Sequence, residues 1–156
     1  MRKVTLICVG NLKEKYLQDA VAEYEKRLGK FFDFNLIEIA ESKLQGKVSE
    51  GEIAKALKNE SDKILSKIKG KNLCALCVEG KQKSSEDFAD FIAQQTDNGE
   101  LFFIIGSSYG LDKQLKDAST QLSFSKMTFP HQLMRVIFLE QLYRAGTIIN
   151  NIEYHK

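Results

Sequence analysis

The sequence is poor in the features that mark linkers, secreted scaffolds and membrane spans. It contains a single proline, and no low-complexity stretch or internal repeat divides its 156 residues, so we expect one domain spanning residues 1–156. No stretch approaches the roughly 18 consecutive apolar residues that indicate a membrane helix. The apolar run near the N-terminus ends at Gly10, too early for a signal peptide. These absences predict a cytoplasmic protein that does not associate with membranes.

A strong excess of one charge and a metal-binding pattern are also missing. The 23 Lys and Arg residues face 21 Asp and Glu, a net charge of +2, which neither requires nor excludes a nucleic-acid partner because a local patch can still be basic. The two histidines and the scattered cysteines do not have zinc-ligand spacing. Cys74 and Cys77 match C-x-x-C, but residues three apart in a strand face opposite sides. Together with Cys8 they are expected to be ordinary buried thiols.

What the sequence does contain is a regular alternation of strand and helix patterns. Continuous apolar runs predict strands, and apolar residues recurring every three or four positions predict helices. We expect strands at residues 4–9, 34–39, 72–78, 101–105 and about 122–124, with helices between them and a last helix from Pro130 to Ile149. This order predicts an α/β fold, a mainly parallel sheet with helices on both faces. Ligands bind such sheets beyond the carboxyl ends of the strands, where loops 79–83, 106–111 and 125–131 would lie.

The last helix is unusually apolar. Eleven of the seventeen residues from Leu133 to Ile149 are apolar and cover nearly the whole circumference, so burial against a second subunit of a homodimer is the simplest explanation. Arg135, Glu140 and Arg144 interrupt it. Glu140 and Arg144, four apart, can form an ordinary intrahelical ion pair, whereas arginine also suits the recognition of phosphates and bases.

Two loops allow competing interpretations. The segment from Gly106 to Gly110 matches G-x-S-x-G, the nucleophile elbow of serine hydrolases, with Ser108 as nucleophile and Glu140 and His155 in the expected chain order. No glycine-rich oxyanion loop precedes it, so the hydrolase is the weaker hypothesis. The same glycines can let backbone amides approach a ligand, or the loop can be a plain turn. Residues 124–131 could offer an apolar slot and backbone groups to a purine, with His131 as a cap or packing residue.

Several blocks, in order along the whole chain, resemble the RlmH family of SPOUT-class methyltransferases, which methylate a pseudouridine of 23S ribosomal RNA. The resemblance implies an α/β fold with a C-terminal trefoil knot, a homodimer, and S-adenosylmethionine as the cofactor. It also implies methyl transfer to ring nitrogen 3 of pseudouridine in 23S rRNA, within the large subunit or the ribosome. A ribosome-associated RNA-binding protein without catalysis is the alternative. The matching blocks are residues 9–16, 23–28, 79–81, 105–106, 122–145 and 154–156.

The resemblance assigns the cofactor pocket, and for the reaction that it implies we hypothesise roles for residues of the tail and the last helix. The tail and last helix would supply His155 as base or orienter, Tyr154 to position the base, and Arg144 for phosphate or the developing anion. The tail of one subunit is expected to complete the site of the other. The family's second glycine is replaced by Ser107, and its usual aromatic by Gly146. The cofactor pocket would contain Leu76, Gly106, Phe124, Ser125, Lys126, Met127, Thr128 and Phe129, and the substrate would contact Arg135, Glu140 and Lys156.

Overall fold

Five strands and five helices alternate along the chain in the computed structural model, which describes all 156 residues. The α/β class predicted from the sequence is therefore confirmed. No helix combines the length and apolar character needed to cross a membrane. The strands are β1 (Arg2–Val9), β2 (Phe32–Ile39), β3 (Leu73–Gln82), β4 (Leu101–Ile105) and β5 (Thr120–Ser123), and the helices are α1 (Lys15–Leu28), α2 (Glu50–Ser66), α3 (Ser85–Asp97), α4 (Lys113–Asp117) and α5 (His131–Ile149).

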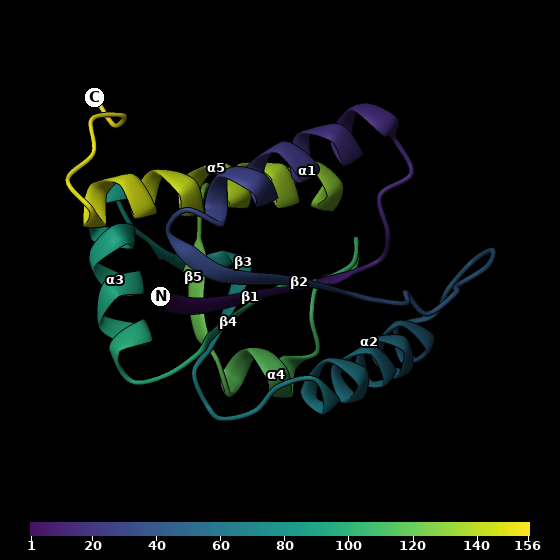
Figure 1. Cartoon of the computed structure of the whole chain (residues 1–156). Coiled ribbons are helices and arrows are strands. Elements are labelled where there is room, and N and C mark those ends of the chain that lie inside the picture. The colour runs from purple at the N-terminus through teal and green to yellow at the C-terminus, as the bar shows by residue number, and fades with distance from the viewer.

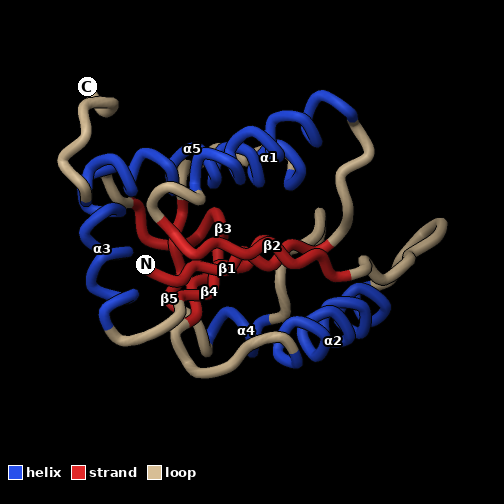
Figure 2. Tube along the Cα trace, viewed as in Figure 1, coloured by secondary structure: helices blue, strands red, loops and turns tan.

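The sheet is entirely parallel, in the order β2-β1-β4-β3-β5. Helices α1, α3 and α5 cover one face, and α2 and α4 cover the other (Figures 1 and 2). The chain moves toward one edge along the first face and returns along the second. All four crossovers consequently have the same hand, as parallel βαβ connections require.

Each face of the sheet has its own apolar core. Side chains of α1, α3 and α5 pack on one face around Phe103 and Phe138, whose ring centroids lie 4.7 Å apart. Ile64 of α2 and Leu115 of α4 pack on the opposite face against residues such as Ile104. Because both faces are covered, β4 is buried along its whole length, which explains its uninterrupted apolar sequence.

Local signals explain where two helices begin. Ser49 and Glu52 form the capping box that their spacing predicts: the Ser49 side chain accepts from the Glu52 amide at 3.1 Å, and the Glu52 carboxylate accepts from the Ser49 amide. The carbonyl of Pro130 accepts the Met134 amide at 2.9 Å and so starts α5. The proline therefore stands just before the helix, where its missing N–H is not needed.

The third strand differs from its prediction. It continues past Val78 to Gln82, because residues 77–80 leave the sheet and the chain then returns to it. Leu76 and Lys81 accordingly both pair with Leu122 of β5. A Cβ at Gly80 would lie 2.6 Å from the Leu122 backbone, so only glycine allows the two strands to approach here. The excursion of residues 77–80 becomes a wall of the main cavity.

Cys8 and Cys74 are the ordinary buried thiols that the sequence predicted, whereas Cys77 is only half-buried. All three are free. Burial raises the pKa of both Cys8 and Cys74 to about 12, which keeps them protonated and unreactive at neutral pH. Cys77 is half-buried and faces Gln121, with the sulfur 3.7 Å from the amide oxygen. Cys74 instead belongs to the core under α5.

Candidate functional site

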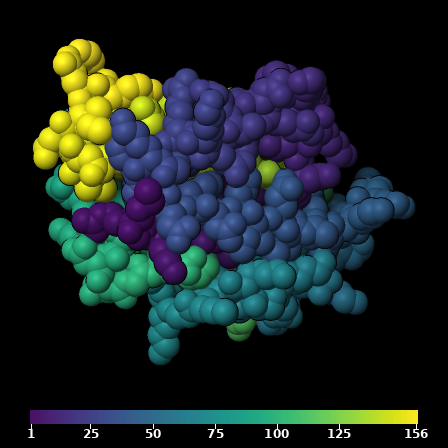
Figure 3. Space-filling model, viewed as in Figure 1, coloured from purple at the N-terminus to yellow at the C-terminus, as the bar shows by residue number.

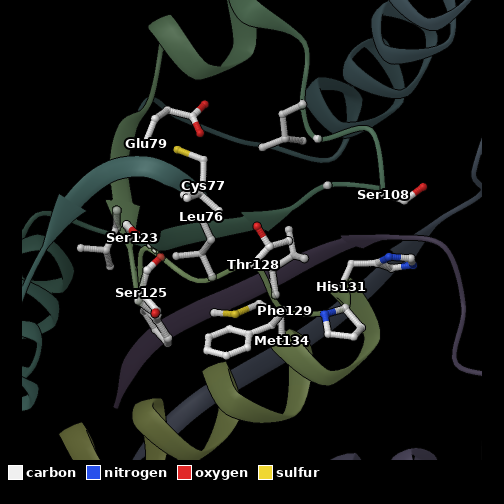
Figure 4. A pocket seen from close by; sticks show the side chains of 18 of the residues that line it. Leu76, Cys77, Glu79, Ser108, Ser123, Ser125, Thr128, Phe129, His131 and Met134 are labelled. Carbon is white, nitrogen blue, oxygen red and sulfur yellow. Dashed lines mark hydrogen bonds between the residues drawn. The ribbon is translucent and has the colours of Figure 1, made fainter.

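A cavity of about 550 Å³ opens beyond the carboxyl ends of β3, β4 and β5. Its walls come from the excursion of β3, the loop between β4 and α4, and the segment between β5 and α5, as Figure 4 shows. These are the three loops expected from the rule for parallel sheets. The volume falls within the roughly 300–1,000 Å³ of sites that bind small molecules and cofactors.

A tight turn between β4 and α4 forms one side of this cavity. A Cβ at Gly106 would lie 2.7 Å from the carbonyl carbon of Gly110, so the turn closes only with glycine at position 106. The Gly110 amide donates to the Ser107 carbonyl at 2.8 Å, and Gly110 adopts a positive φ of 87°. Ser107 has no positive φ. Serine therefore fits where the RlmH resemblance leads one to expect a second glycine.

A buried carboxylate lies behind this turn, on the α2 side. Glu60 is only 3% exposed. Its Oε2 accepts the Ser42 amide at 2.8 Å, while Oε1 has no hydrogen-bond partner. Burial raises the pKa of Glu60, and the Ser42 amide and, more weakly, the nearby Ser107 hydroxyl oppose that rise. Few hydrogen bonds therefore offset the cost of burying the charged form of Glu60.

Seven of the eight residues expected at the cofactor line the cavity. The exception is Lys126, whose side chain is exposed and lies outside it. Ser125 shapes the β5–α5 segment: its hydroxyl accepts the Met127 amide at 3.0 Å, and its carbonyl accepts the Ser123 hydroxyl at 2.9 Å. The seven are Leu76, Gly106, Phe124, Ser125, Met127, Thr128 and Phe129.

An ion pair that the sequence did not reveal stands at the same cavity. Lys116 of α4 lies 2.8 Å from Glu79 of β3, and both side chains line the wall. The contact lowers the pKa of Glu79 and raises that of Lys116. Glu79 was expected in a ligand loop, but nothing in the local pattern around Lys116 marks it, because its partner lies 37 residues away.

The expected catalytic residues gather at the other end of α5. Arg144 donates to Oε1 of Glu140 from Nε at 3.1 Å and Nη2 at 2.6 Å, and its Nη1 lies 3.2 Å from Nδ1 of His155. His155 Nε2 lies 2.7 Å from Oε1 of Glu86. Tyr154 lies 4.9 Å from the guanidinium and donates to Glu140. We call these five residues the tail cluster; none of them lines the main cavity.

The tail cluster has defined electrostatics. A guanidinium can only donate, so His155 accepts from Arg144 through Nδ1 and donates from Nε2 to Glu86. The hydrogen bond to Glu140 raises the pKa of Arg144, and burial raises the pKa of the Tyr154 hydroxyl. Lys156 is exposed and pairs with Glu153 at 2.8 Å instead of joining the cluster. The C-terminal segment, yellow in Figure 3, lies at one end of the molecule.

Arg135 does not reach a surface where RNA could contact it. It is 1% exposed, its Nη1 lies 2.7 Å from Glu38, and its Nη2 donates to the Gly10 carbonyl at 3.1 Å. The expectation that it binds substrate is therefore not supported by this geometry. The buried guanidinium instead joins α5 to the ends of β1 and β2. An apolar helix tolerates this charge because Glu38 and the Gly10 carbonyl pair with it.

The hydrolase arrangement is not assembled. Ser108 is exposed in the turn after β4 (Figure 4), whereas the ring nitrogens of His155 face Arg144 and Glu86. A nucleophile and its base must lie within hydrogen-bond reach of each other. The G-x-S-x-G match is thus a coincidence of a glycine-bounded turn.

The parallel sheet, the cofactor-sized cavity at its carboxyl edge and the glycine turn define an α/β protein that binds a small molecule beside its last strands. The chain belongs to the SPOUT methyltransferase family: residues 2–155 match the family described as "Predicted SPOUT methyltransferase". The chain is therefore a methyltransferase, which requires a methyl donor.

Its relatives carry a more specific name. The chain is 46% identical to "Ribosomal RNA large subunit methyltransferase H" of Streptococcus uberis, over 99% of both chains. It is 47% identical to the protein of that name from Lactococcus lactis subsp. cremoris, again over 99% of both. The Limosilactobacillus reuteri protein of that name is 44% identical over 98% of this chain and 99% of its own. The resemblance drawn from the sequence blocks is thereby confirmed.

Proposed function

We propose that this chain transfers a methyl group from S-adenosylmethionine to ring nitrogen 3 of a pseudouridine in 23S ribosomal RNA. The observation that carries the proposal is the cavity of about 550 Å³ at the carboxyl edge of the sheet, in a chain of the SPOUT methyltransferase family. The name of its relatives supplies the ribosomal RNA of the large subunit. Such an enzyme works where ribosomes are, in the bacterial cytoplasm.

The residues of the cavity suit a nucleoside with a charged sulfur. Gly106 keeps the β4–α4 turn clear of side chains, since any Cβ would meet Gly110. Leu76, Met134 and Phe129 offer apolar surface, and backbone groups of the β5–α5 segment are available to an adenine edge. Glu79 brings a carboxylate to this wall, already paired with the ammonium of Lys116 at 2.8 Å. We infer that the trefoil knot implied by the family lies in these same loops.

The chemistry requires a proton acceptor. S-adenosylmethionine supplies an electrophilic methyl group: the imide nitrogen forms the new C–N bond, the C–S bond breaks, and its electron pair stays on sulfur. The N3 proton must leave first or at the same time. His155 can accept it only after releasing Arg144 from Nδ1, and that movement frees the guanidinium to face the developing anion.

Unpaired lysines near the cavity fit an RNA partner. Three exposed lysines take part in none of the ion pairs: Lys81 and Lys83 at the end of β3, and Lys126 in the β5–α5 segment. Exposed cations of this kind bind phosphates with little sequence preference. They supply a local basic patch on a chain whose net charge is only +2.

A homodimer would complete this site. Val78, Met127 and Leu133 leave 46%, 75% and 40% of their surfaces exposed around the cavity and the start of α5, and a second subunit would cover them. Within one chain, Met134 of the cavity and Arg144 of the tail cluster are ten residues apart, about 15 Å along the helix. We propose that a partner's tail brings its His155 to this cavity.

A truncated chain tests the assignment of the tail. A variant that ends at Glu153 should bind S-adenosylmethionine in calorimetry as the full chain does. Its methyl transfer to ribosomes that lack the modification should fall by roughly 10²–10⁴-fold, the range for a lost proton-transfer group. Lys113→Ala, which removes an exposed cation on α4, is the control and should stay active. Undiminished transfer by the truncated chain would contradict the role of the tail.

Mixing subunits then tests the exchange of tails. Gly106→Ala, which disturbs the turn at the cavity, and the variant ending at Glu153 should each lose most of the transfer alone when S-adenosylmethionine is limiting. If a partner's tail completes the site, co-expressed mixed dimers regain transfer through one intact site. If activity stays absent in mixed dimers, each tail serves its own cavity.

A further inference from the structure

A second cavity, of about 230 Å³, lies beside the first. The two share a wall made of Leu122, Ser123, Phe124 and Phe129. The smaller cavity continues from that wall to the start of α3 and the middle of α5. Its volume is below the roughly 300–1,000 Å³ of sites for drug-sized ligands, so it suits a single ring better than a whole cofactor.

The lining of this cavity divides into an aromatic side and a polar side. Phe124, which is half-buried, gives apolar surface on which a planar base can stack. Phe88 lies behind it, 3% exposed, and supports it edge to face with ring centroids 5.4 Å apart. Gln141 lies on the polar side: its Oε1 accepts the Ser85 hydroxyl at 2.9 Å, which leaves its amide N–H groups without a partner. Lys83 supplies an ammonium group at the edge, and no carboxylate lines the cavity.

Two groups here can only donate, the amide N–H of Gln141 and the ammonium of Lys83, whereas the hydroxyls of the lining serines can also accept. A pyrimidine with two carbonyls, of the uracil type, presents an acceptor on each side of its imide nitrogen, whereas cytosine presents one carbonyl and an amino group. Donors that point at carbonyls favour the dioxo ring, because a buried donor facing another donor is left unsatisfied. A ring carbonyl placed against Gln141 or Lys83 is therefore favoured over an amino group at the same place.

The second cavity lies between the main cavity and the residues that contact the C-terminal tail. One wall belongs to the main cavity, where the methyl donor would bind. On the other side, Ser85 is followed by Glu86, which holds His155, and Gln141 is followed one turn later by Arg144. A ring placed here therefore lies beside the donor pocket, at the start of α3 and the middle of α5.

We propose that this second cavity receives the dioxo pyrimidine base of the target nucleotide, with Gln141 donating to a ring carbonyl and Lys83 facing the adjoining phosphate. The proposal rests on the proposed function. It adds a base-binding site with named specificity groups, and Gln141 is its central residue.

The test uses the full-length protein, with S-adenosylmethionine binding and transfer to unmodified ribosomes measured side by side. Gln141→Ala should leave the affinity for S-adenosylmethionine unchanged and lower kcat/KM for ribosomes by at least about tenfold, as expected when a buried hydrogen bond is lost. Gln141→Glu keeps the size and the acceptor for Ser85 but replaces the N–H donors, so it should lose at least as much. Gln94→Ala, an exposed glutamine of α3, is the control.

A direct binding measurement separates base recognition from a structural role. We would titrate the wild-type protein with pseudouridine 5′-monophosphate and follow the Gln141 side-chain amide by NMR, assigning it from its absence in Gln141→Ala. The amide should shift with this probe and shift less with cytidine 5′-monophosphate. Equal shifts with both nucleotides, or wild-type kcat/KM in Gln141→Glu, would overturn the base-binding site. A wild-type protein that transfers no methyl group to ribosomes would instead overturn the proposed function.

Discussion

Replacing Gly146 by alanine should destabilise the protein even though it removes a glycine from the middle of a helix. In an open helix the change would stabilise by about 1 kcal/mol. Here a Cβ would lie 2.7–2.9 Å from three atoms of the Phe31 side chain. Phe31 is itself held against Tyr143, with ring centroids 5.6 Å apart. Overpacking of this kind costs roughly 1–3 kcal/mol, so the net loss should be about 1 kcal/mol.

The measurement is urea denaturation of Gly146→Ala in two backgrounds. In the wild-type background the unfolding midpoint should fall. In a Phe31→Leu background the smaller side chain leaves room for the methyl group, so the same substitution should raise the midpoint relative to Phe31→Leu alone. A sign reversal between backgrounds would show that the added methyl group and the ring of Phe31 compete for the same space. Stabilisation by Gly146→Ala in the wild-type background would refute the reasoning.

Two further predictions concern the turn at the main cavity and the carboxylate behind it. Gly106→Ala should weaken S-adenosylmethionine binding in calorimetry by at least about tenfold, since moving the Gly110 backbone aside costs roughly 1–3 kcal/mol. Gly51→Ala, whose Cβ would make only an ordinary contact of 3.9 Å with the Ser49 hydroxyl, should bind normally, and equal binding by both would count against the tight turn. Glu60 has a folded pKa above its unfolded value, so the stability it contributes is present below the ordinary glutamate pKa and is lost as the pH rises through the raised one. Glu60→Gln, which can still accept the Ser42 amide, should therefore gain stability relative to wild type between pH 4 and pH 7, and a difference that is flat with pH in urea titrations would contradict this.

Much of the architecture could be predicted because a strand that is buried on both faces has an uninterrupted apolar sequence. The run at β4 is apolar at every position, and its bounds were predicted correctly. The end of β3 was not, because Val78 closes the apolar run while residues 81–82 return to the sheet only through pairing with β5. That return depends on Gly80 meeting the Leu122 backbone, a contact that no periodicity in the sequence reports.

The candidate site was predictable in its loops and less so in its pairings. The carboxyl ends of parallel strands located the main cavity, and the family resemblance identified seven of its lining residues. Arg135 was assigned to substrate because a charge interrupts an apolar helix. The structure instead pairs it with Glu38, 97 residues away, and a partner at that separation cannot be found from spacing alone. The contact of Phe31 with Gly146 could not be predicted either, because the two residues lie far apart in the sequence.

The strand order also determines when an active protein can exist. Both neighbours of β3 in the sheet, β4 and β5, come later in the chain, and so does β4 as the second neighbour of β1. While the first hundred residues are made, only β1 and β2 can therefore pair. Synthesis of that length takes roughly 5–20 s at about 5–20 residues per second, and pairing between such distant segments is itself slow. The main cavity needs residues up to Met134, and the tail cluster needs His155. The main cavity can therefore form before the last residues are added, whereas the tail cluster, with the catalytic role proposed for it, cannot.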